Sequence, residues 1–149
     1  MRIAPFRKSS LPPFKAMMKE SSGEFGSAWA KHITRVFASG AHWQNAGNYA
    51  VLEEGRAVAA FSLRSEVEAL VLYFLLISKD FRNKGIGASI IKFAEKEAKK
   101  TGAAFLRLDA YSGKKAILFY KKQGFKVGGR VRYYEEVGDD QTFLYKKIR

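Results

Sequence analysis

The residues best suited to bind a ligand lie in one segment, residues 77–88, which reads Ile-Ser-Lys-Asp-Phe-Arg-Asn-Lys-Gly-Ile-Gly-Ala. An apolar run precedes this segment and a helical pattern follows it, so a buried strand is predicted to turn directly into a helix. The first amides of a helix have no acceptor within the helix, and they bind anions such as a pyrophosphate. Gly85 and Gly87 lack the Cβ that would keep phosphates away, and Arg82 and Lys84 add positive charge.

The spacing of these glycines disfavours two common nucleotide-binding loops. The position three after Gly87 is Ile90, where a Rossmann loop needs glycine, and no Gly-Lys-Ser/Thr sequence is present for a P-loop. For a Gly-x-Gly pair taken alone, an ordinary strand-to-helix turn remains the alternative.

The elements that must position this loop follow from hydrophobic periodicity. Residues 70–77 are apolar on both faces, which predicts a central strand with both sides of the sheet covered. Residues 87–100 place their apolar side chains on one stripe, which predicts an amphipathic helix. The other predicted elements are a short helix that carries Phe14, Met17 and Met18, helices at 24–38 and 112–123, and strands at 2–6, 49–53, 57–63, 105–110, 131–137 and 142–148.

Turn signals join these elements. Residues 54–56 and 138–140 are predicted hairpin turns, Gly40 is expected to end the 24–38 helix, and Ser112 is expected to cap the 112–123 helix. The resulting order is β α α β β β α β α β β. It indicates the α/β class (an α+β arrangement with a mixed sheet), with helices on both faces of a central sheet.

Composition limits the kind of protein. A length of 149 residues, 47% of them hydrophobic, predicts a single globular domain over 1–149. A net charge of +13 indicates an anionic partner. The absence of cysteine excludes disulfides and thiolate nucleophiles, and His32 and His42 are too few to predict a metal site.

Neither a membrane span nor a secretory signal is predicted. The longest apolar run covers nine residues, 69–77, about half of what a membrane-spanning helix needs. The first seven residues contain no apolar core or cleavage site of a signal peptide. We therefore expect a cytoplasmic protein that does not bind membranes.

The pattern Arg82-x-x-Gly85-x-Gly87 after a buried strand resembles the acetyl-CoA loop of the GNAT superfamily of N-acetyltransferases. That loop reads Arg/Gln-x-x-Gly-x-Gly/Ala, and the match is complete. About 30 residues later, an Ala116-x-x-x-Tyr120 helix that ends in Gly-Phe is similar to the second signature of the same family.

The resemblance spans roughly residues 70–125, and the predicted order of elements is also that of the family. One position departs from the pattern. Many members carry an asparagine that bonds the cofactor three residues before the alanine of the second signature, and this chain has Gly113 there. Ser112 and Asp109 are candidates to replace it.

The resemblance implies direct transfer of an acetyl group from acetyl-CoA to a primary amine, without a covalent enzyme intermediate. Pantetheine would pair with the backbone of Leu75 and Ile77 like an added strand. The implied cofactor-binding residues are Leu75, Ile77, Arg82, Asn83, Lys84, Gly85, Ile86, Gly87 and Ala88.

Tyr120 matches the position of the family's general acid, which protonates the leaving thiolate. Packing of an aromatic ring against the sheet is the alternative role. Glu66 and Glu68 precede the central strand and are the first candidates to bind or deprotonate the amine through a water. Both also suit a solvated face, and Asp109 and Tyr111 are further candidates.

The acceptor is either a protein amine (an α-amine or a lysine) or a small amine. Acids at 53–54, 66, 68, 135–136 and 139–140 are expected to form an acidic mouth for it, opposite a positive surface for coenzyme A. The chain is expected to act as a monomer or homodimer. The alternative is a non-catalytic basic module that binds nucleic acid or a ribonucleoprotein, although no RNA-reading aromatic motif or helix-turn-helix signature is present.

Overall fold

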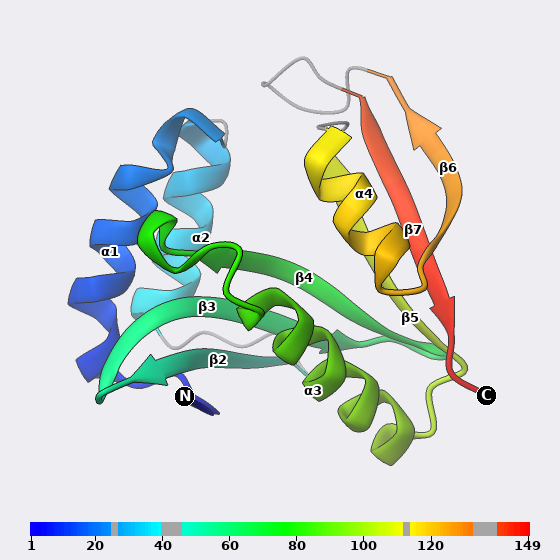
Figure 1. The fold of residues 1–149 in the computed structure, drawn as a ribbon, viewed down its shortest axis with the longest axis horizontal. Coiled ribbons are helices and arrows are strands. Elements are labelled where there is room, and N and C mark those ends of the chain that lie inside the picture. The colour runs from blue at the N-terminus through cyan, green and yellow to red at the C-terminus, as the bar shows by residue number, and fades with distance from the viewer. Residues whose placement is uncertain (25–26, 40–45, 112–113, 133–139) are drawn as a thin grey trace.

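The computed structural model describes residues 1–24, 27–39, 46–111, 114–132 and 140–149 (Figure 1). The strands are β1 (Arg2–Pro5), β2 (Ala46–Glu53), β3 (Arg56–Ser65), β4 (Ala69–Ile77), β5 (Phe105–Tyr111), β6 (Lys126–Val131) and β7 (Gln141–Lys147). The helices are α1 (Leu11–Glu20), α2 (Ser27–Ser39), α3 (Ile86–Thr101) and α4 (Lys114–Lys122), with short 3-10 turns η1 (Lys8–Ser10), η2 (Ser22–Glu24) and η3 (Lys79–Phe81). Apart from the 3-10 turns, this is the order that the sequence predicts.

One seven-stranded sheet has the order β1-β2-β3-β4-β5-β7-β6. Among the described strands the one parallel pair is β4 with β5, so the sheet is mixed, and β4 is its central strand, as predicted. The predicted hairpin joins β2 to β3, and Glu54 and Gly55 both have positive φ in its two-residue turn. That conformation matches the twist of the flanking strands.

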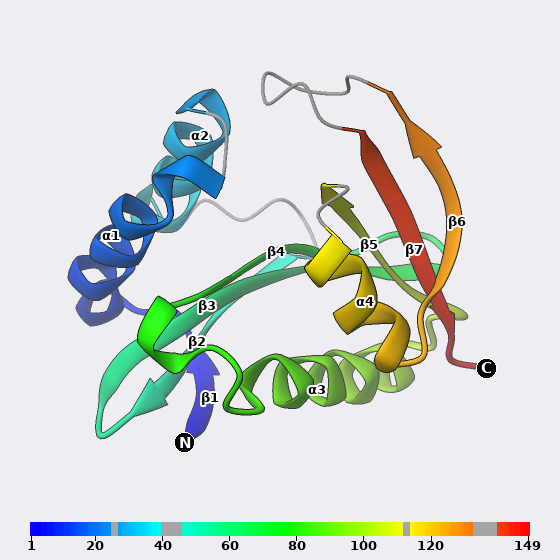
Figure 2. The ribbon, with the colours of Figure 1, turned by 45° about the horizontal axis from the view of Figure 1, so that its top comes forward.

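Two hydrophobic clusters lie on the two faces of the sheet. On one face, α1 and α2 pack against β4 through side chains that include Phe14, Ile33, Phe37 and Phe74. On the other face, α3 and α4 pack against β5 (Figure 2). The second cluster includes Ile90, Ala94, Leu106, Leu108 and Ile117. Because both faces are covered, the continuous apolar run of β4 is buried along most of its length.

The last hairpin differs from the prediction. The predicted strand at 131–137 is wrong in its bounds, because β6 spans Lys126–Val131 and Arg132 already lies in a turn. Two consecutive glycines, Gly128 and Gly129, are typical of a position between strands rather than within one. In the structure they lie inside β6, where the register against β7 shifts between Val127 and Gly129. A bulge at this point accommodates glycine within a strand.

Some predicted features lie outside the described residues. These are the helix stop at Gly40, the cap at Ser112, Gly113, His42, and the part of the last hairpin at 133–139.

Candidate functional site

The central strand and its parallel neighbour separate halfway along their length. Pairing of β4 with β5 covers only Ala69 to Leu72 against Phe105 to Leu108, and the two strands diverge beyond it (Figures 1 and 2). On the other side, the register of β4 against β3 shifts next to Tyr73, which marks a bulge. In the described part of the chain, no strand pairs with Leu75 and Ile77 on the β5 side. This edge of β4 can accept an extended ligand as an added strand.

The loop after β4 presents the start of α3 at the same end of the strand. Asn83 and Gly85 have positive φ values of 58° and 81°, and Gly85 is the N-cap of α3. Asn83, Lys84 and Gly85 are exposed. The amides of Ile86, Gly87 and Ala88 are the first three of the helix and lack intrahelical acceptors. The loop therefore offers a cluster of donors and the positive end of a helix dipole to an anion.

Gly87 is required by the approach of α4. It is buried, and a Cβ built on it would lie 2.8 Å from Cζ of Phe119. Phe119 was not among the residues singled out from the sequence. The signal available in the sequence was its position directly before Tyr120. Neighbouring residues on a helix lie about 100° apart around the axis, so two consecutive aromatic residues indicate that two adjacent faces of α4 are packed against other elements.

Arg82 holds the loop against the segment that joins α1 to α2. Its Nη1 and Nη2 donate to the two carboxylate oxygens of Glu24 at 2.9 and 3.2 Å. Its Nη2 also donates to Oγ of Ser21, and its Nε donates to the carbonyl of Ile77 at 3.1 Å. The Glu24 partnership spans 58 residues of sequence, and no local pattern indicated it.

Tyr120 lies on α4 between two other aromatic rings. The centroids of Phe119 and Phe125 are 5.1 and 5.8 Å from its own. Burial raises the pKa of Tyr120 to about 12. Among the described residues its hydroxyl has no hydrogen-bond partner. A protonated hydroxyl that no described residue engages can donate to a bound ligand.

Glu66 and Glu68 lie at the other end of β4, in the turn that joins it to β3. Strand β4 separates this turn from the loop before α3, and the eight residue steps from Ala69 to Ile77 correspond to roughly 26 Å at about 3.3 Å per residue. The structure therefore does not bring these two acids together with the residues at 82–88.

Glu66 is also committed to two arginines. Its carboxylate accepts from Arg64 at 2.7 Å and from Arg107 at 3.0 Å. The hydrogen bond from Arg64 is the main reason that the pKa of Glu66 lies below its ordinary value, and Arg107 lowers it further against the opposing effect of burial. No hydrogen bond or ion pair joins the side chain of Glu68 to any described residue.

Asp109 lies on the divergent part of β5, beyond Leu108, the last residue paired with β4. Leu106 and Leu108 point to the α3 and α4 side, so Asp109 points to the opposite face, where its Oδ1 is 3.9 Å from Nη1 of Arg107. The side chain of Tyr111 lies outside the described part of the structure.

The acids do not gather into the expected mouth in the part of the chain that the structure describes. Glu53 and Glu54 lie at the β2–β3 turn, and Glu53 pairs with the amino terminus at 3.3 Å. Glu66 and Glu68 lie at the opposite end of β3. Residues 135, 136 and 139 lie outside the described ranges.

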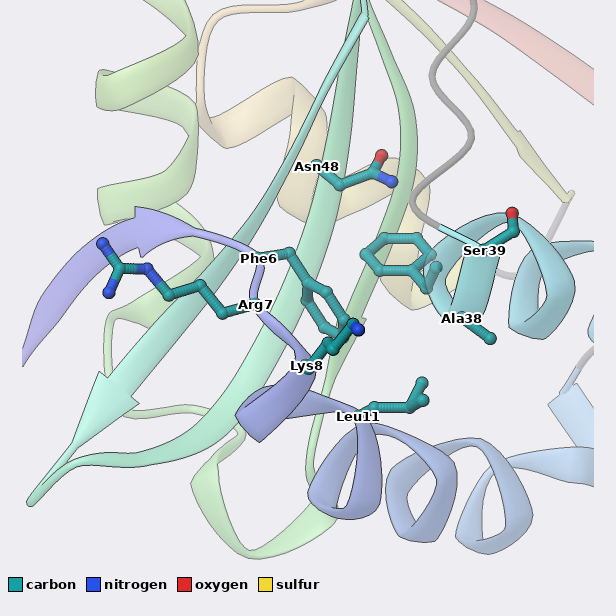
Figure 3. Close-up of a pocket in the computed structure, with 8 residues that line it drawn as sticks. Phe6, Arg7, Lys8, Leu11, Ala38, Ser39 and Asn48 are labelled. Atoms are coloured by element: carbon teal, nitrogen blue, oxygen red, sulfur yellow. The ribbon is translucent and has the colours of Figure 1, made fainter.

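A separate cavity of about 150 Å³ lies between β1, β2 and the ends of α1 and α2 (Figure 3). Its lining includes Phe6, Lys8, Phe37 and Asn48, and it contains none of the predicted site residues. The described residues contain no group of three or more His, Cys, Asp or Glu side chains arranged to hold a metal ion. They also contain no helix that is long and apolar enough to cross a membrane.

Comparison with known proteins identifies relatives of this arrangement. A profile of the acetyltransferase (GNAT) family matches residues 14–125. No curated protein matches the sequence.

Several solved structures share the fold. The ribosomal-protein-S18-alanine N-acetyltransferase of Escherichia coli superposes with a TM-score of 0.80 at 20% identity, over 99% of this chain and 93% of that one. An aminoglycoside 6′-N-acetyltransferase complexed with coenzyme A gives 0.75 at 15% identity, over 100% and 98%. A chimeric spermidine N-acetyltransferase derived in part from Vibrio cholerae gives 0.77 at 13% identity, over 99% and 94%.

Proposed function

Because the chain belongs to the GNAT acetyltransferase family, we propose that it transfers an acetyl group from acetyl-CoA directly to a primary amine. The observation that carries this proposal is the position of the α3 amino terminus beside the unpaired edge of β4. In this proposal the pyrophosphate accepts from the amides of Ile86, Gly87 and Ala88, and pantetheine extends along Leu75 and Ile77. The solved structure with coenzyme A is that of a relative by fold, and it supports a coenzyme A site in this fold.

The reaction requires a neutral amine. A lysine amine with a pKa near 10.4 is only about 0.04% neutral at pH 7, whereas an α-amine near 7.8 is about 14% neutral. The amine nitrogen attacks the thioester carbonyl, a C–N bond forms, the C–S bond breaks, and the amine loses a proton. Asp109 is the acid on the divergent part of β5, and we assign it, through a water, as the first acceptor of that proton.

Tyr120 is assigned as the donor to the leaving sulfur. With a pKa of about 12, its hydroxyl stays protonated throughout the neutral range. Full proton transfer to a thiolate of pKa about 8.5 is uphill, so the hydroxyl acts first as a hydrogen-bond donor to the sulfur as negative charge develops there. Since this hydroxyl has no partner among the described residues, donation breaks no described bond.

Arg82 is assigned a positioning role as well as a place in the cofactor loop. Its bonds to Glu24, Ser21 and the Ile77 carbonyl tie the loop to the end of β4 and to the α1–α2 connection. Acetyl-CoA would contact the α3 amides through its pyrophosphate and β4 through the arm that carries the thioester. A fixed position of the α3 amides relative to β4 therefore fixes the position of the thioester.

The acceptor class is tested by following release of the coenzyme A thiol with three sets of amines. These are peptides with a free α-amine, amino-blocked peptides with a single lysine, and small diamines. We expect turnover with peptides, fastest with α-amines because they cost least to deprotonate. Turnover of small diamines alone would assign the site to small molecules.

The residue roles are tested in the same assay. Tyr120→Phe is expected to lower kcat about 100-fold with acetyl-CoA affinity kept within about threefold, and Asp109→Asn is expected to lower kcat similarly. The pair Glu66→Gln and Glu68→Gln is expected to keep kcat. Full activity of Tyr120→Phe would contradict the assignment of Tyr120 as the acid. A large loss of kcat in both Gln variants would instead assign the base to the turn before β4.

A further inference from the structure

An open groove of about 540 Å³ lies between α1 and α2, which run side by side on one face of the sheet (Figures 1 and 2). Four exposed cations border it, Lys15 and Lys19 from α1 and Lys31 and Arg35 from α2. Each pair is spaced four residues apart, so its two charges lie on one face of the helix, about 6 Å apart along the axis.

No acid neutralises this groove within the described part of the chain. The first 52 residues of the sequence contain only two acids, Glu20 and Glu24. Both point instead to the loop after β4, where Oε2 of Glu20 accepts from the amide of Lys79 at 3.2 Å and Glu24 binds Arg82. None of the four groove cations forms an ion pair with a described residue. Like charges four residues apart repel each other, so the arrangement favours an anionic partner over an empty groove.

The groove exposes little apolar surface, which indicates that binding there depends on charge. Met18, its largest apolar side chain, is only 5% exposed, and the other apolar lining consists of Ala30 and Ala38. An acidic amphipathic helix gains most of its affinity by burying apolar side chains, and this floor offers it little surface. A phosphodiester backbone needs only the cations, because it gains affinity through release of its condensed counterions.

We propose that the groove between α1 and α2 binds the phosphate backbone of a nucleic acid duplex. A duplex carries one negative charge per about 1.7 Å of its axis, so about 6 Å of duplex presents three to four phosphates to the four cations. This inference is independent of acetyl transfer, since the groove contains none of the residues assigned to the reaction.

The proposal is tested by fluorescence anisotropy with a labelled 20-base-pair DNA duplex between 50 and 200 mM salt. Contact with four phosphates gives a slope of log K against log salt of about −3.6, or roughly a 150-fold loss of affinity over that range. The groove variant carries Lys15→Gln, Lys19→Gln, Lys31→Gln and Arg35→Gln. The control carries Lys92→Gln, Lys96→Gln, Lys99→Gln and Lys126→Gln, all at exposed positions on α3 and β6.

Each variant loses four positive charges, so the comparison distinguishes a site in the groove from an effect of the overall charge of the protein. We expect the groove variant to bind at least tenfold more weakly at 50 mM salt, with a slope flatter by about three, and the control to change its slope by less than one. Equal weakening of both variants overturns the proposal, as does the absence of duplex binding by the wild type at 50 mM salt.

Two measurements on the wild-type protein keep the test independent of variant folding. Amine-reactive labelling with mass spectrometry is expected to show that the duplex protects Lys15, Lys19 and Lys31 and leaves Lys92 and Lys96 reactive. Saturating coenzyme A is expected to leave duplex binding unchanged. Protection of the α3 lysines alone, or displacement of the duplex by poly-glutamate at equal charge concentration, contradicts the assignment; the latter outcome would assign the groove to acidic proteins.

Discussion

Arg82 illustrates how far residue types alone can predict a role. The sequence places it in an anion-binding loop, and that placement follows from local pattern. Its bidentate contact with Glu24 joins residues 58 positions apart, and nothing in either local sequence indicates the pairing. The position of a charged residue was therefore predictable, whereas the direction of its side chain depends on tertiary contacts.

This difference leads to a prediction at the scale of the residue. If Arg82 acts by positioning the loop, Arg82→Ala and Glu24→Gln each weaken acetyl-CoA binding about three- to tenfold, and the double variant is no weaker than the worse single variant. Binding is measured by calorimetric titration. If Arg82 instead contacts phosphate directly, Glu24→Gln releases the guanidinium and keeps or improves affinity, while Arg82→Ala alone loses it.

For Tyr120, the sequence likewise predicted the position of the residue but not the pKa of its side chain. The signature of α4 predicted its position, but its pKa depends on burial among Phe119, Phe125 and the sheet, which only the packed structure shows. Glu66 is the opposite example, since its position suggested a base and its contacts with Arg64 and Arg107 make it a weaker one.

At the scale of elements, α3 and α4 are coupled by the contact between Gly87 and Phe119. Periodicity predicted both helices because their apolar stripes follow the 3.6-residue repeat, but it carries no information on how closely two helices approach. The same limit explains the error in β6, where glycine accommodated by a bulge resembled the end of an element.

We expect Gly87→Ala to destabilise the protein by about 1 to 3 kcal/mol, because its Cβ would press against the Phe119 ring. Replacing Phe119 by alanine removes the obstacle. In the background of Phe119→Ala, the Gly87→Ala change is therefore expected to cost little, which denaturant unfolding of the four proteins in the cycle measures. A Gly87→Ala protein as stable as the wild type would show that α4 moves away easily.

The turn between β3 and β4 carries a pH-dependent contribution to stability. The folded-state pKa of Glu66 is lowered, so its ion pairs stabilise the fold above pH about 4.5 and this stability is lost as the pH falls through the lowered value. The carboxylate is partly exposed, and the contribution is below about 1 kcal/mol.

Glu66→Gln is accordingly expected to lower the Tm by up to about 4 °C at pH 7 and to lower it progressively less as the pH falls below about 4.5. Glu68→Gln, in the same turn, is the matched control and is expected to leave the Tm unchanged at both pH values. A Glu66→Gln difference that grows on acidification would contradict the direction of the pKa shift.

At the scale of the whole molecule, two features of the charge distribution are separate. The α3 amino terminus lies at the diverging end of β4 and is proposed to bind the cofactor, whereas the groove cations lie on α1 and α2, which cover one face of the sheet. A net charge of +13 predicted an anionic partner without locating it.

The order of elements, the mixed sheet and its central strand were predictable because each rests on local periodicity and on connection rules that hold across proteins.

The divergence of β4 from β5 was not predictable from the pattern of either strand. Past the last pair at Leu72 and Leu108, β4 continues as an apolar run and β5 keeps its alternation of polar and apolar residues. The bulge next to Tyr73 has no glycine or proline to mark it in the sequence. The opening between the strands is thus a property of the assembled sheet, and the proposed cofactor site depends on it.

The most direct test of the proposed function is calorimetric titration of acetyl-CoA into the wild type, Ala88→Asp and Ala88→Asn. Residue 88 is the third residue of α3, where an aspartate interacts favourably with the helix dipole but repels a bound pyrophosphate. We predict one site per chain with micromolar affinity in the wild type, near wild-type binding in Ala88→Asn, and at least a 100-fold loss in Ala88→Asp, with a Tm equal to or above that of the wild type. Absence of binding heat in folded wild-type protein, or retained affinity in Ala88→Asp, would contradict the proposed site.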